Sequence, residues 1–338
     1  MNNFYQLTEE QKRLIITQSA EKAGLDKQII EKDLWVTTIL QILFSLDVSK
    51  YLVFKGGTSL SKVWGVIERF SEDIDVSIDR RFFGLDGDLT KKQIKKLRKE
   101  SSLFVSKELF NELVNEIDKF HLSNALSVAY QTDGEGDNAY PEPRQIYITY
   151  NSLFENVLAY IKPIIILEVG SRSLFEPMKS ERVKSVVEYC YHNVITSVCD
   201  SEIHTAVPEK TFLEKAFLLH ELFSTDGARL ANRKSRHLYD LERMMDLPFA
   251  TKAIEDDNLW DTIHHHRDIF THMKDVDYTP DIRDRISLVP PQKYMQTWEE
   301  DYNNMRSSMI YGKTISFNEL IARMHMLENK FRNHHMKE

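Results

Sequence analysis

One short segment places the strongest limit on what this 338-residue chain can fold into. From Asp73 to Asp79 the sequence reads DIDVSID, so polar residues alternate with branched apolar ones. Successive side chains of a strand point to opposite faces of a sheet, and this alternation therefore predicts a half-buried strand. Asp73, Asp75, Ser77 and Asp79 share its polar face. The chain is thus expected to contain a sheet with one face on a core and one polar face.

The other strand signals also fall before residue 208. An apolar run at 51–54 stops at Gly56-Gly57, which predicts a strand entering a tight turn, and a short helix is expected at 59–64. Further strands are predicted at 125–131, 145–150 and 163–169, and the isoleucine-rich composition of the last is typical of a central strand. Helical spacing is present up to about residue 46 and over 90–120, while 132–143 has the composition of a loop.

Beyond Pro208 the pattern is helical. Helices are expected at 209–224, 236–245, 251–273, 291–306 and 317–333. The sequence therefore predicts an α+β protein with two domains. Residues 1–207 form the sheet-containing domain with its N-terminal helices, and residues 208–338 form a helical C-terminal domain.

Charge and hydropathy limit which partners the chain is expected to bind and where in the cell it is expected to be. The formal net charge is -8, which argues against tight, non-specific binding of nucleic acid by the whole surface but leaves room for a local basic patch. No stretch approaches the roughly 18 apolar residues of a membrane span. The first residues also lack the basic start and apolar centre of a signal peptide. A cytoplasmic location without a membrane partner is expected.

Two neighbouring segments carry the candidate chemistry, FKGGTSL at 54–60 and RFSEDID at 69–75. Paired glycines let backbone amides approach phosphate oxygens closely, and Thr58 or Ser59 can add a hydroxyl. Asp73 and Asp75 point the same way, and two close carboxylates repel unless a cation lies between them. Oxygen-only ligands suit magnesium. Each feature alone is common in loops and on solvated strands, whereas their order along the chain favours a nucleoside triphosphate site with Mg²⁺.

Gly56-Gly57-Thr58-x-Leu60-x-Lys62 followed by Arg69-x-Ser71-x-Asp73-x-Asp75 resembles the signature of the AbiEii/AbiGii toxin family, within the DNA polymerase β-like nucleotidyltransferase superfamily. The resemblance implies a nucleotidyltransferase fold, a mixed sheet flanked by helices. It also implies metal binding by Asp73 and Asp75, with two Mg²⁺ ions expected. Gly57 and Thr58 would lie against the triphosphate, and Ser71 beside it. The complete set expected to contact the nucleotide is Lys55, Gly56, Gly57, Thr58, Ser59, Lys62, Arg69, Ser71 and Arg236.

The superfamily places a third acid on a neighbouring strand, and Glu168 is the candidate. It ends the run Ile164-Ile165-Ile166-Leu167, where a carboxylate is costly to bury unless a metal or an arginine compensates it. Two alternatives stay open. Glu168 is a metal ligand or general base, or it forms a simple salt bridge with Arg172.

The segment EKTFLEKA at 209–216 resembles a later motif of the family, a helix whose lysine faces the nucleotide. Lys215 projects from an apolar stripe, because Leu218, Leu219 and Leu222 follow at helical spacing. A lysine there either extends outward to solvent or meets an anion. The resemblance implies a catalytic role for Lys215.

Arg236 and Asp240 match the Arg-x3-Asp helix of the family. One turn apart, they could form a helix ion pair worth about 0.2–0.5 kcal/mol. The alternative has Arg236 reaching phosphate and Asp240 acting in catalysis by orienting Arg236 or Lys215. With Arg229 and Arg233, Arg236 also forms the best local basic patch for an RNA acceptor.

Other conspicuous residues are expected to be structural. His264, His265 and His266 would point about 100° apart on a helix, which predicts a solvated helix face rather than a metal site. Trp260 and Trp298, together with Tyr302, have the spacing of core residues.

The leading hypothesis is a magnesium-dependent nucleotidyltransferase that moves a nucleoside monophosphate from NTP to an acceptor and releases pyrophosphate. The family resemblance implies the toxin of a type IV-like toxin-antitoxin or abortive-infection system, with a cognate antitoxin as partner. Its acceptor would be RNA, such as the 3′ end of tRNA. Alternatives are a protein or small-molecule hydroxyl as acceptor, or a non-catalytic nucleotide-binding protein. The intact Asp73, Asp75 and Lys215 speak against the last.

Overall fold

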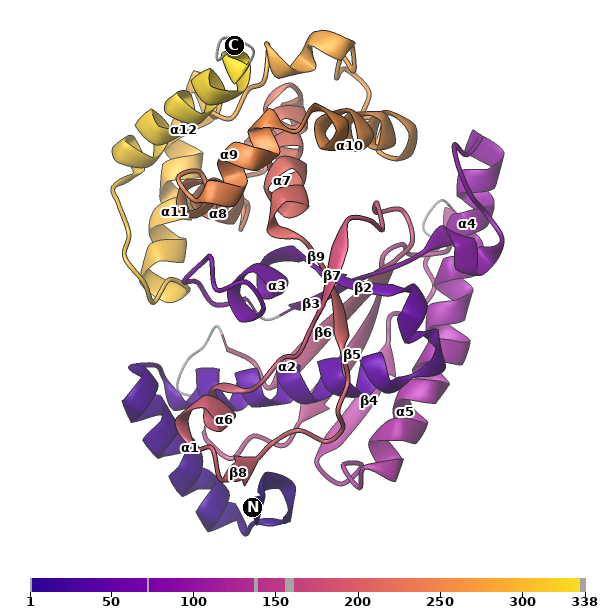
Figure 1. Ribbon diagram of the computed structural model, residues 1–338, viewed down its shortest axis with the longest axis vertical. Coiled ribbons are helices and arrows are strands. Elements are labelled where there is room, and N and C mark those ends of the chain that lie inside the picture. The colour runs from indigo at the N-terminus through magenta and orange to yellow at the C-terminus, as the bar shows by residue number, and fades with distance from the viewer. Residues whose placement is uncertain (1, 72, 137–138, 156–160, 335–338) are drawn as a thin grey trace. The chain divides into compact units, whose positions relative to one another are not determined.

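The computed structural model describes residues 2–71, 73–136, 139–155 and 161–334, and the chain divides into two compact units (Figure 1). The first comprises residues 1–63 and 71–205, and the second comprises residues 64–70 and 206–338. The chain therefore enters the second unit briefly at Trp64–Phe70 before it returns to the sheet. This excursion follows the first candidate segment, 54–60, and includes Arg69 and Phe70, the first two residues of the second.

The first unit contains a seven-stranded sheet with strand order β4-β5-β6-β3-β2-β9-β7. β3 runs parallel to β6 and β2 parallel to β9, whereas β2/β3, β4/β5 and β5/β6 are antiparallel, so the sheet is mixed. The strands are β2 (Leu52–Lys55), β3 (Asp73–Ile78), β4 (Leu126–Tyr130), β5 (Arg144–Tyr150), β6 (Ile164–Gly170), β7 (Met178–Glu181) and β9 (Ile203–Ala206). The predicted α+β class and the interior place of the isoleucine-rich strand are confirmed.

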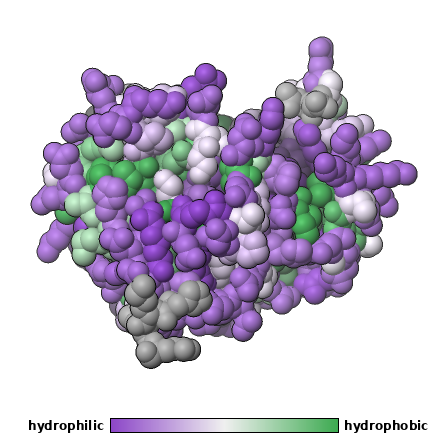
Figure 2. All heavy atoms as spheres, turned by 90° about the horizontal axis from the view of Figure 1, so that it is seen from above, coloured by the Kyte–Doolittle hydropathy of each residue, from purple (hydrophilic) through white to green (hydrophobic). Residues whose placement is uncertain are grey.

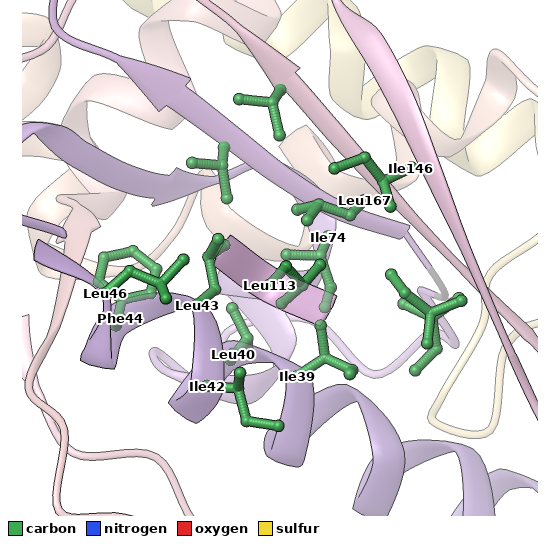
Figure 3. Packing of buried hydrophobic residues seen from close by; sticks show 14 of the residues in the cluster. Ile39, Leu40, Ile42, Leu43, Phe44, Leu46, Ile74, Leu113, Ile146 and Leu167 are labelled. Carbon is green, nitrogen blue, oxygen red and sulfur yellow. The ribbon is translucent and has the colours of Figure 1, made fainter. Parts of the chain in front are cut away.

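Two helices precede the sheet, α1 (Glu9–Ala23) and α2 (Lys27–Ser45). α2 lies across one face of the sheet (Figure 1). Its apolar side chains pack against those of β3, β5 and β6, which removes both surfaces from water and forms the main core (Figure 3). The central residues of this core are Ile39, Leu40, Leu43, Ile74, Ile146 and Leu167.

The predicted helix at 90–120 is confirmed, with one irregularity. α4 (Lys91–Phe104) starts at the N-cap Thr90 and continues through a π-helical turn, Val105–Leu109, into α5 (Phe110–Lys119). The short α3 (Gly56–Lys62) begins at the glycine pair itself, earlier than predicted. β1 (Asn2–Asn3), α6 (Val186–Cys190) and β8 (Val194–Ile195) complete the described strands and α-helices of this unit. Within the predicted loop at 132–143, residues 137 and 138 lie outside the described part of the chain.

The second unit is helical where the structure describes it. Its helices are α7 (Pro208–Phe223), α8 (Ser235–Met244), α9 (Pro248–Glu255), α10 (Asp257–Phe270), α11 (Met295–Ser308) and α12 (Phe317–Arg332). The single helix predicted at 251–273 is wrong, because it breaks at Asp256. This side chain accepts a hydrogen bond from the Leu259 N–H and so caps α10.

Aromatic residues fill the interior of the second unit. Trp260, Trp298 and Tyr302 are buried, as predicted. The expectation of a solvated triple-histidine face is wrong for two of the three residues. His264 is half-buried and stacks on Phe217, while His266 is half-buried and stacks on Phe270. Stacking on an aromatic neighbour stabilises such a ring beyond the apolar area that it buries.

Hydrophilic side chains cover most of the face seen in Figure 2, with apolar residues in separate patches. In the part of the chain that the structure describes, no helix combines the length and hydropathy that crossing a bilayer requires.

Candidate active site

A row of polar residues crosses four neighbouring strands of the sheet. Lys55 on β2 pairs with Asp75 on β3, Asp75 pairs with Glu168 on β6, and Glu168 pairs with Gln145 on β5. Directly opposed residues project from the same face of a sheet. Ile74, Leu167 and Ile146, one position away on each strand, face the core under α2. The polar row therefore occupies the opposite face, and it brings two predicted site acids together.

Asp75 and Glu168 interact directly. Burial raises the pKa of Glu168, and the negative charge of Asp75 raises it further. The protonated form of Glu168 donates a hydrogen bond to Asp75, while the charge of Lys55 opposes the rise in the Glu168 pKa. Two carboxylates held this closely repel each other unless a cation lies between them.

Two residues that the sequence did not indicate hold Glu168 in place. Gln145 donates from Nε2 to Oε1 of Glu168 at 2.6 Å, and the Tyr147 hydroxyl donates to Oε1 of Gln145 at 2.7 Å. The predicted alternative of a salt bridge between Glu168 and Arg172 is wrong, because Arg172 pairs with Glu142. The partner of Glu168 is decided by strand register, which no local pattern reveals.

The glycine bend lies directly against the acid pair. Gly56 has a φ of 77°, in the left-handed region that favours glycine. A Cβ atom at this position would lie 2.0 Å from Oδ2 of Asp75 and 2.8 Å from its Cγ. No residue with a side chain fits without displacing Asp75. The backbone of the bend and the carboxylate of Asp75 are therefore in contact.

Hydroxyl groups tie the bend to the start of β3. Thr58 donates to the carbonyl oxygen of Asp73, and a 2.9 Å hydrogen bond joins Thr58 Oγ1 to Ser71 Oγ. Ser59 donates from Oγ to the carbonyl oxygen of Gly56 at 2.9 Å. Thr58 and Ser59 are both buried. Their hydroxyls thus already serve bonds within the protein that fix the bend relative to the strand.

Lys62, at the end of α3, is also engaged within the first unit. Its ammonium group pairs with Asp33 of α2 and donates to the carbonyl oxygen of Lys184 at 3.3 Å. Only a small fraction of this side chain is exposed. The predicted contact of Lys62 with the nucleotide would require it to leave these partners.

The acids on the polar face fit a hard divalent cation by their chemistry. Asp73, Asp75 and Glu168 offer only carboxylate oxygens, and Asp73 precedes Asp75 by two residues on the same face of β3. Among the described residues, no group of three or more His, Cys, Asp or Glu side chains is gathered closely enough to hold a metal. What the structure shows is the pair formed by Asp75 and Glu168, with Asp73 beside it along the strand.

The second unit contains a separate, buried charge cluster centred on Asp240. The Asp240 carboxylate has no exposed surface and receives Arg69 through two bonds, Nε to Oδ1 at 2.7 Å and Nη2 to Oδ2 at 2.8 Å. Lys215 Nζ lies 2.9 Å from Oδ2 of Asp240. Although burial acts to raise it, the pKa of Asp240 is held below its usual value by Arg69 and Lys215. The carboxylate is therefore engaged by these two cations rather than by Arg236 in the predicted helix ion pair.

Lys215 does not extend to solvent, so that alternative is wrong. Its side chain is buried, and burial lowers its pKa, while Asp240 opposes the shift. His237 Nδ1 lies 3.4 Å from Lys215 Nζ. Burial, together with the charges of Lys215 and Arg236, lowers the pKa of His237 well below its usual value, so that the ring is neutral at pH 7. A neutral ring can accept a hydrogen bond from the ammonium group.

Comparison with known proteins identifies the family. The model for the nucleotidyl transferase AbiEii toxin of type IV toxin-antitoxin systems matches residues 39–323, most of the chain. The solved structure of MenT4, a nucleotidyltransferase toxin from Mycobacterium tuberculosis, is 16% identical with a TM-score of 0.49, and the alignment covers 96% of this chain and 98% of that chain. No curated protein matches significantly. The chain belongs to the AbiEii family of nucleotidyltransferase toxins, and so to the toxins of type IV toxin-antitoxin systems.

Proposed function

We propose that this nucleotidyltransferase requires Mg²⁺ and transfers a nucleoside monophosphate from NTP to an RNA acceptor, with the 3′ end of tRNA as the first candidate. Family membership supports NTP as substrate and a cognate antitoxin as partner. One observation carries the rest of the proposal. The Asp75 carboxylate touches the Gly56 backbone and is paired in register with Glu168 on β6, so the glycine bend and the acid pair meet at one point on the polar face.

The bend would receive the triphosphate. Gly56 and Gly57 have no side chains, so phosphate oxygens can approach the backbone N–H groups closely. The internal bonds of Thr58 and Ser59 hold this backbone in place before the nucleotide arrives. Asp73, Asp75 and Glu168 would hold Mg²⁺, which when bound neutralises charge on the transferred phosphate and lowers the pKa of the attacking hydroxyl.

The transfer itself needs one new bond, one broken bond and a place for one proton. An acceptor hydroxyl oxygen bonds to the α-phosphorus, and the bond from that phosphorus to the pyrophosphate oxygen breaks. The hydroxyl proton passes to a carboxylate, and Glu168 is the candidate acceptor because it lies beside Asp75 on the polar face, with its Oε1 held by Gln145.

In the second unit, we assign a positioning role to Asp240 and Arg69. The family resemblance implies that Lys215 and Arg236 face the nucleotide. Asp240 fixes the ammonium group of Lys215, and Arg69 fixes Asp240 through two parallel hydrogen bonds. Arg69 thus acts through Asp240 rather than on phosphate directly, because its guanidinium is 2% exposed and committed to that carboxylate.

The acceptor is tested by incubating the protein with each α-labelled NTP, Mg²⁺ and total RNA. Label on RNA supports the proposal, and label only on protein or small molecules favours the alternative acceptors. Periodate oxidation destroys the 3′ terminal diol, so oxidised tRNA should accept no label if transfer occurs at that end. The Asp73→Asn/Asp75→Asn variant is the catalytic control. Normal transfer by that variant would refute the assignment of the site.

A further inference from the structure

The most concentrated positive charge of the first unit lies on α4. Residues 91–100 read KKQIKKLRKE, with five lysines and one arginine against a single glutamate, in a chain of formal net charge -8. At the 3.6 residues per turn of a helix, the six cations fall within an arc of about 160°. Leu97 and Phe104 are buried on the other side. We call the exposed lysines the basic face of α4: Lys91, Lys92, Lys95, Lys96 and Lys99.

Most of these charges have no counter-ion among the described residues. Lys96 lies 3.6 Å from Glu100, and Lys99 lies 5.3 Å from the ring centroid of Tyr140. In the described part of the chain, no carboxylate pairs with Lys91, Lys92 or Lys95. Lysines four residues apart repel each other, and the first turn of α4 adds two lysines at the positive end of the helix dipole. This arrangement opposes helix formation, and a bound polyanion would relieve it.

The helix that carries the basic face is held firmly against the sheet that carries the acid pair. Arg144, at the start of β5, donates from Nε to Oγ of Ser102 in α4 at 2.9 Å and is 1% exposed. Gln145, the next residue along, is the one that binds Glu168. Phe104 of α4 also packs on Phe82, with ring centroids 4.8 Å apart. The lysines therefore stand on a helix whose position is fixed within the unit, continuous with α5 (Figure 1).

The composition of this face distinguishes between classes of partner. Between residues 91 and 99 every exposed position is a lysine. Protein interfaces are depleted in lysine at their centres and enriched in aromatic residues, which this face lacks. A membrane-binding helix inserts its apolar side, whereas the apolar side of α4 packs inside the unit. Contacts to a nucleic-acid backbone, by contrast, come from lysine and arginine.

We propose that the basic face of α4 binds the phosphate backbone of the RNA acceptor. This inference rests on the proposed function for its choice of RNA. Lys91, Lys95 and Lys99 form a line about 12 Å long, since a helix rises 1.5 Å per residue, and Lys92 and Lys96 form a second line beside it. Two rows of this length match several successive phosphates rather than one small anion. Such contacts hold and orient the acceptor without reading its sequence.

The test is RNA binding by the full-length triple variant Lys91→Gln/Lys95→Gln/Lys99→Gln. Fluorescence anisotropy with labelled tRNA, at several salt concentrations and without NTP, gives Kd and its salt dependence. Each phosphate contact contributes roughly 0.7–0.9 to the slope of log K against log salt, so the slope should fall by about 2 to 3. Kd at physiological salt should rise about tenfold or more. The matched control Lys50→Gln/Lys179→Gln/Lys252→Gln removes the same charge from exposed positions elsewhere.

A stability measurement distinguishes loss of RNA contacts from loss of folded structure in the triple variant. The triple variant removes like-charge repulsion within α4, so its melting temperature should equal or exceed that of the wild type. In the transfer assay, KM for RNA should rise while KM for NTP stays near the wild-type value. A triple variant that binds RNA with the affinity and salt slope of the control would overturn the proposal. So would loss of binding to the cognate antitoxin or to anionic vesicles with RNA binding intact.

Failure of the proposed function has a different signature. If the wild type binds RNA through these lysines but never transfers label to it, RNA binding by the basic face is supported and RNA as the acceptor is refuted. If the triple variant and the control label RNA equally well, RNA as the acceptor is supported and RNA binding by the basic face is refuted.

Discussion

Substitution of Gly56 by alanine tests the contact between the glycine bend and the acid pair. The new methyl carbon would lie 2.0 Å from Oδ2 of Asp75, and real Cβ contacts essentially never fall below 3.0 Å. The carboxylate must therefore retreat by at least 1.0 Å, the difference between these two distances. A 1 Å misplacement of a reacting group can cost about 100-fold in rate. The left-handed φ of 77° adds about 1–2 kcal/mol of backbone strain.

Gly24→Ala is the matched control. Gly24 also has a left-handed φ, 66°, but a Cβ there meets nothing within 4 Å. Both variants should lose about 1–2 kcal/mol of unfolding free energy by urea denaturation because of the backbone strain, and Gly56→Ala should lose more than Gly24→Ala because of its clash with Asp75. Only Gly56→Ala should lose about 100-fold in kcat for transfer of α-labelled nucleotide. The clash also predicts coupling in a double-mutant cycle, since Asp75→Ala removes the atoms that the methyl group meets.

Equal kcat values for Gly56→Ala and Gly24→Ala would contradict the contact between the bend and Asp75. Simply additive stability losses for Gly56→Ala and Asp75→Ala would also contradict it, because the contact would then carry no energy of its own.

Three further perturbations test the charges at the two clusters. Burial and the charge of Asp75 both raise the pKa of Glu168, and Asp75→Asn removes only the second cause, so NMR titration should show that pKa falling part of the way towards its ordinary value while transfer is lost. An unchanged Glu168 pKa would contradict the pairing. Asp240→Asn leaves Lys215 and Arg69 buried without a compensating charge, which should lower the free energy of unfolding in urea by about 3–5 kcal/mol. A decrease below about 1 kcal/mol would show that solvent reaches these two cations. The pKa of Lys215 is lower in the folded protein than in the unfolded chain. Between these two pKa values the unfolded chain binds more protons, so the free energy of unfolding should rise with pH. The transfer rate should fall over the same pH window as Lys215 loses its proton. Lys215→Arg should abolish this fall at alkaline pH. A fall that persists in the arginine variant would belong to another group.

Local sequence patterns were sufficient to predict a strand where the alternation or the apolar run lay within that strand. The alternation at 73–79 predicted β3, and the unbroken isoleucine run predicted an interior strand, because burial on one or both faces leaves a direct trace in the sequence. β7 and β9 escaped prediction. Each is four residues long, and the register of β9 with β2 is a single pair, Phe54 with Thr205, so neighbouring strands rather than local pattern define them.

The partners of the candidate site residues depend on contacts between distant parts of the chain. Arg69 and Asp240 are 171 residues apart, and nothing near either one indicates the other. Gln145 could be recognised as a partner of Glu168 only once the register of β5 and β6 was known. The glycine pair and the acidic strand were predictable as chemistry. Their direct contact was not, because it follows from the antiparallel pairing of Lys55 with Asp75.

We expect the glycine bend and the acids of β3 and β6 to hold a metal-nucleotide complex. Electron paramagnetic resonance with Mn²⁺ in place of Mg²⁺ measures this as the loss of free Mn²⁺ beyond that in a protein-free sample with the same NTP. In the presence of a non-hydrolysable NTP, the wild type and an Asp86→Asn/Asp88→Asn control should bind Mn²⁺, and Asp73→Asn/Asp75→Asn should not. Equal Mn²⁺ binding by all three proteins would contradict the account.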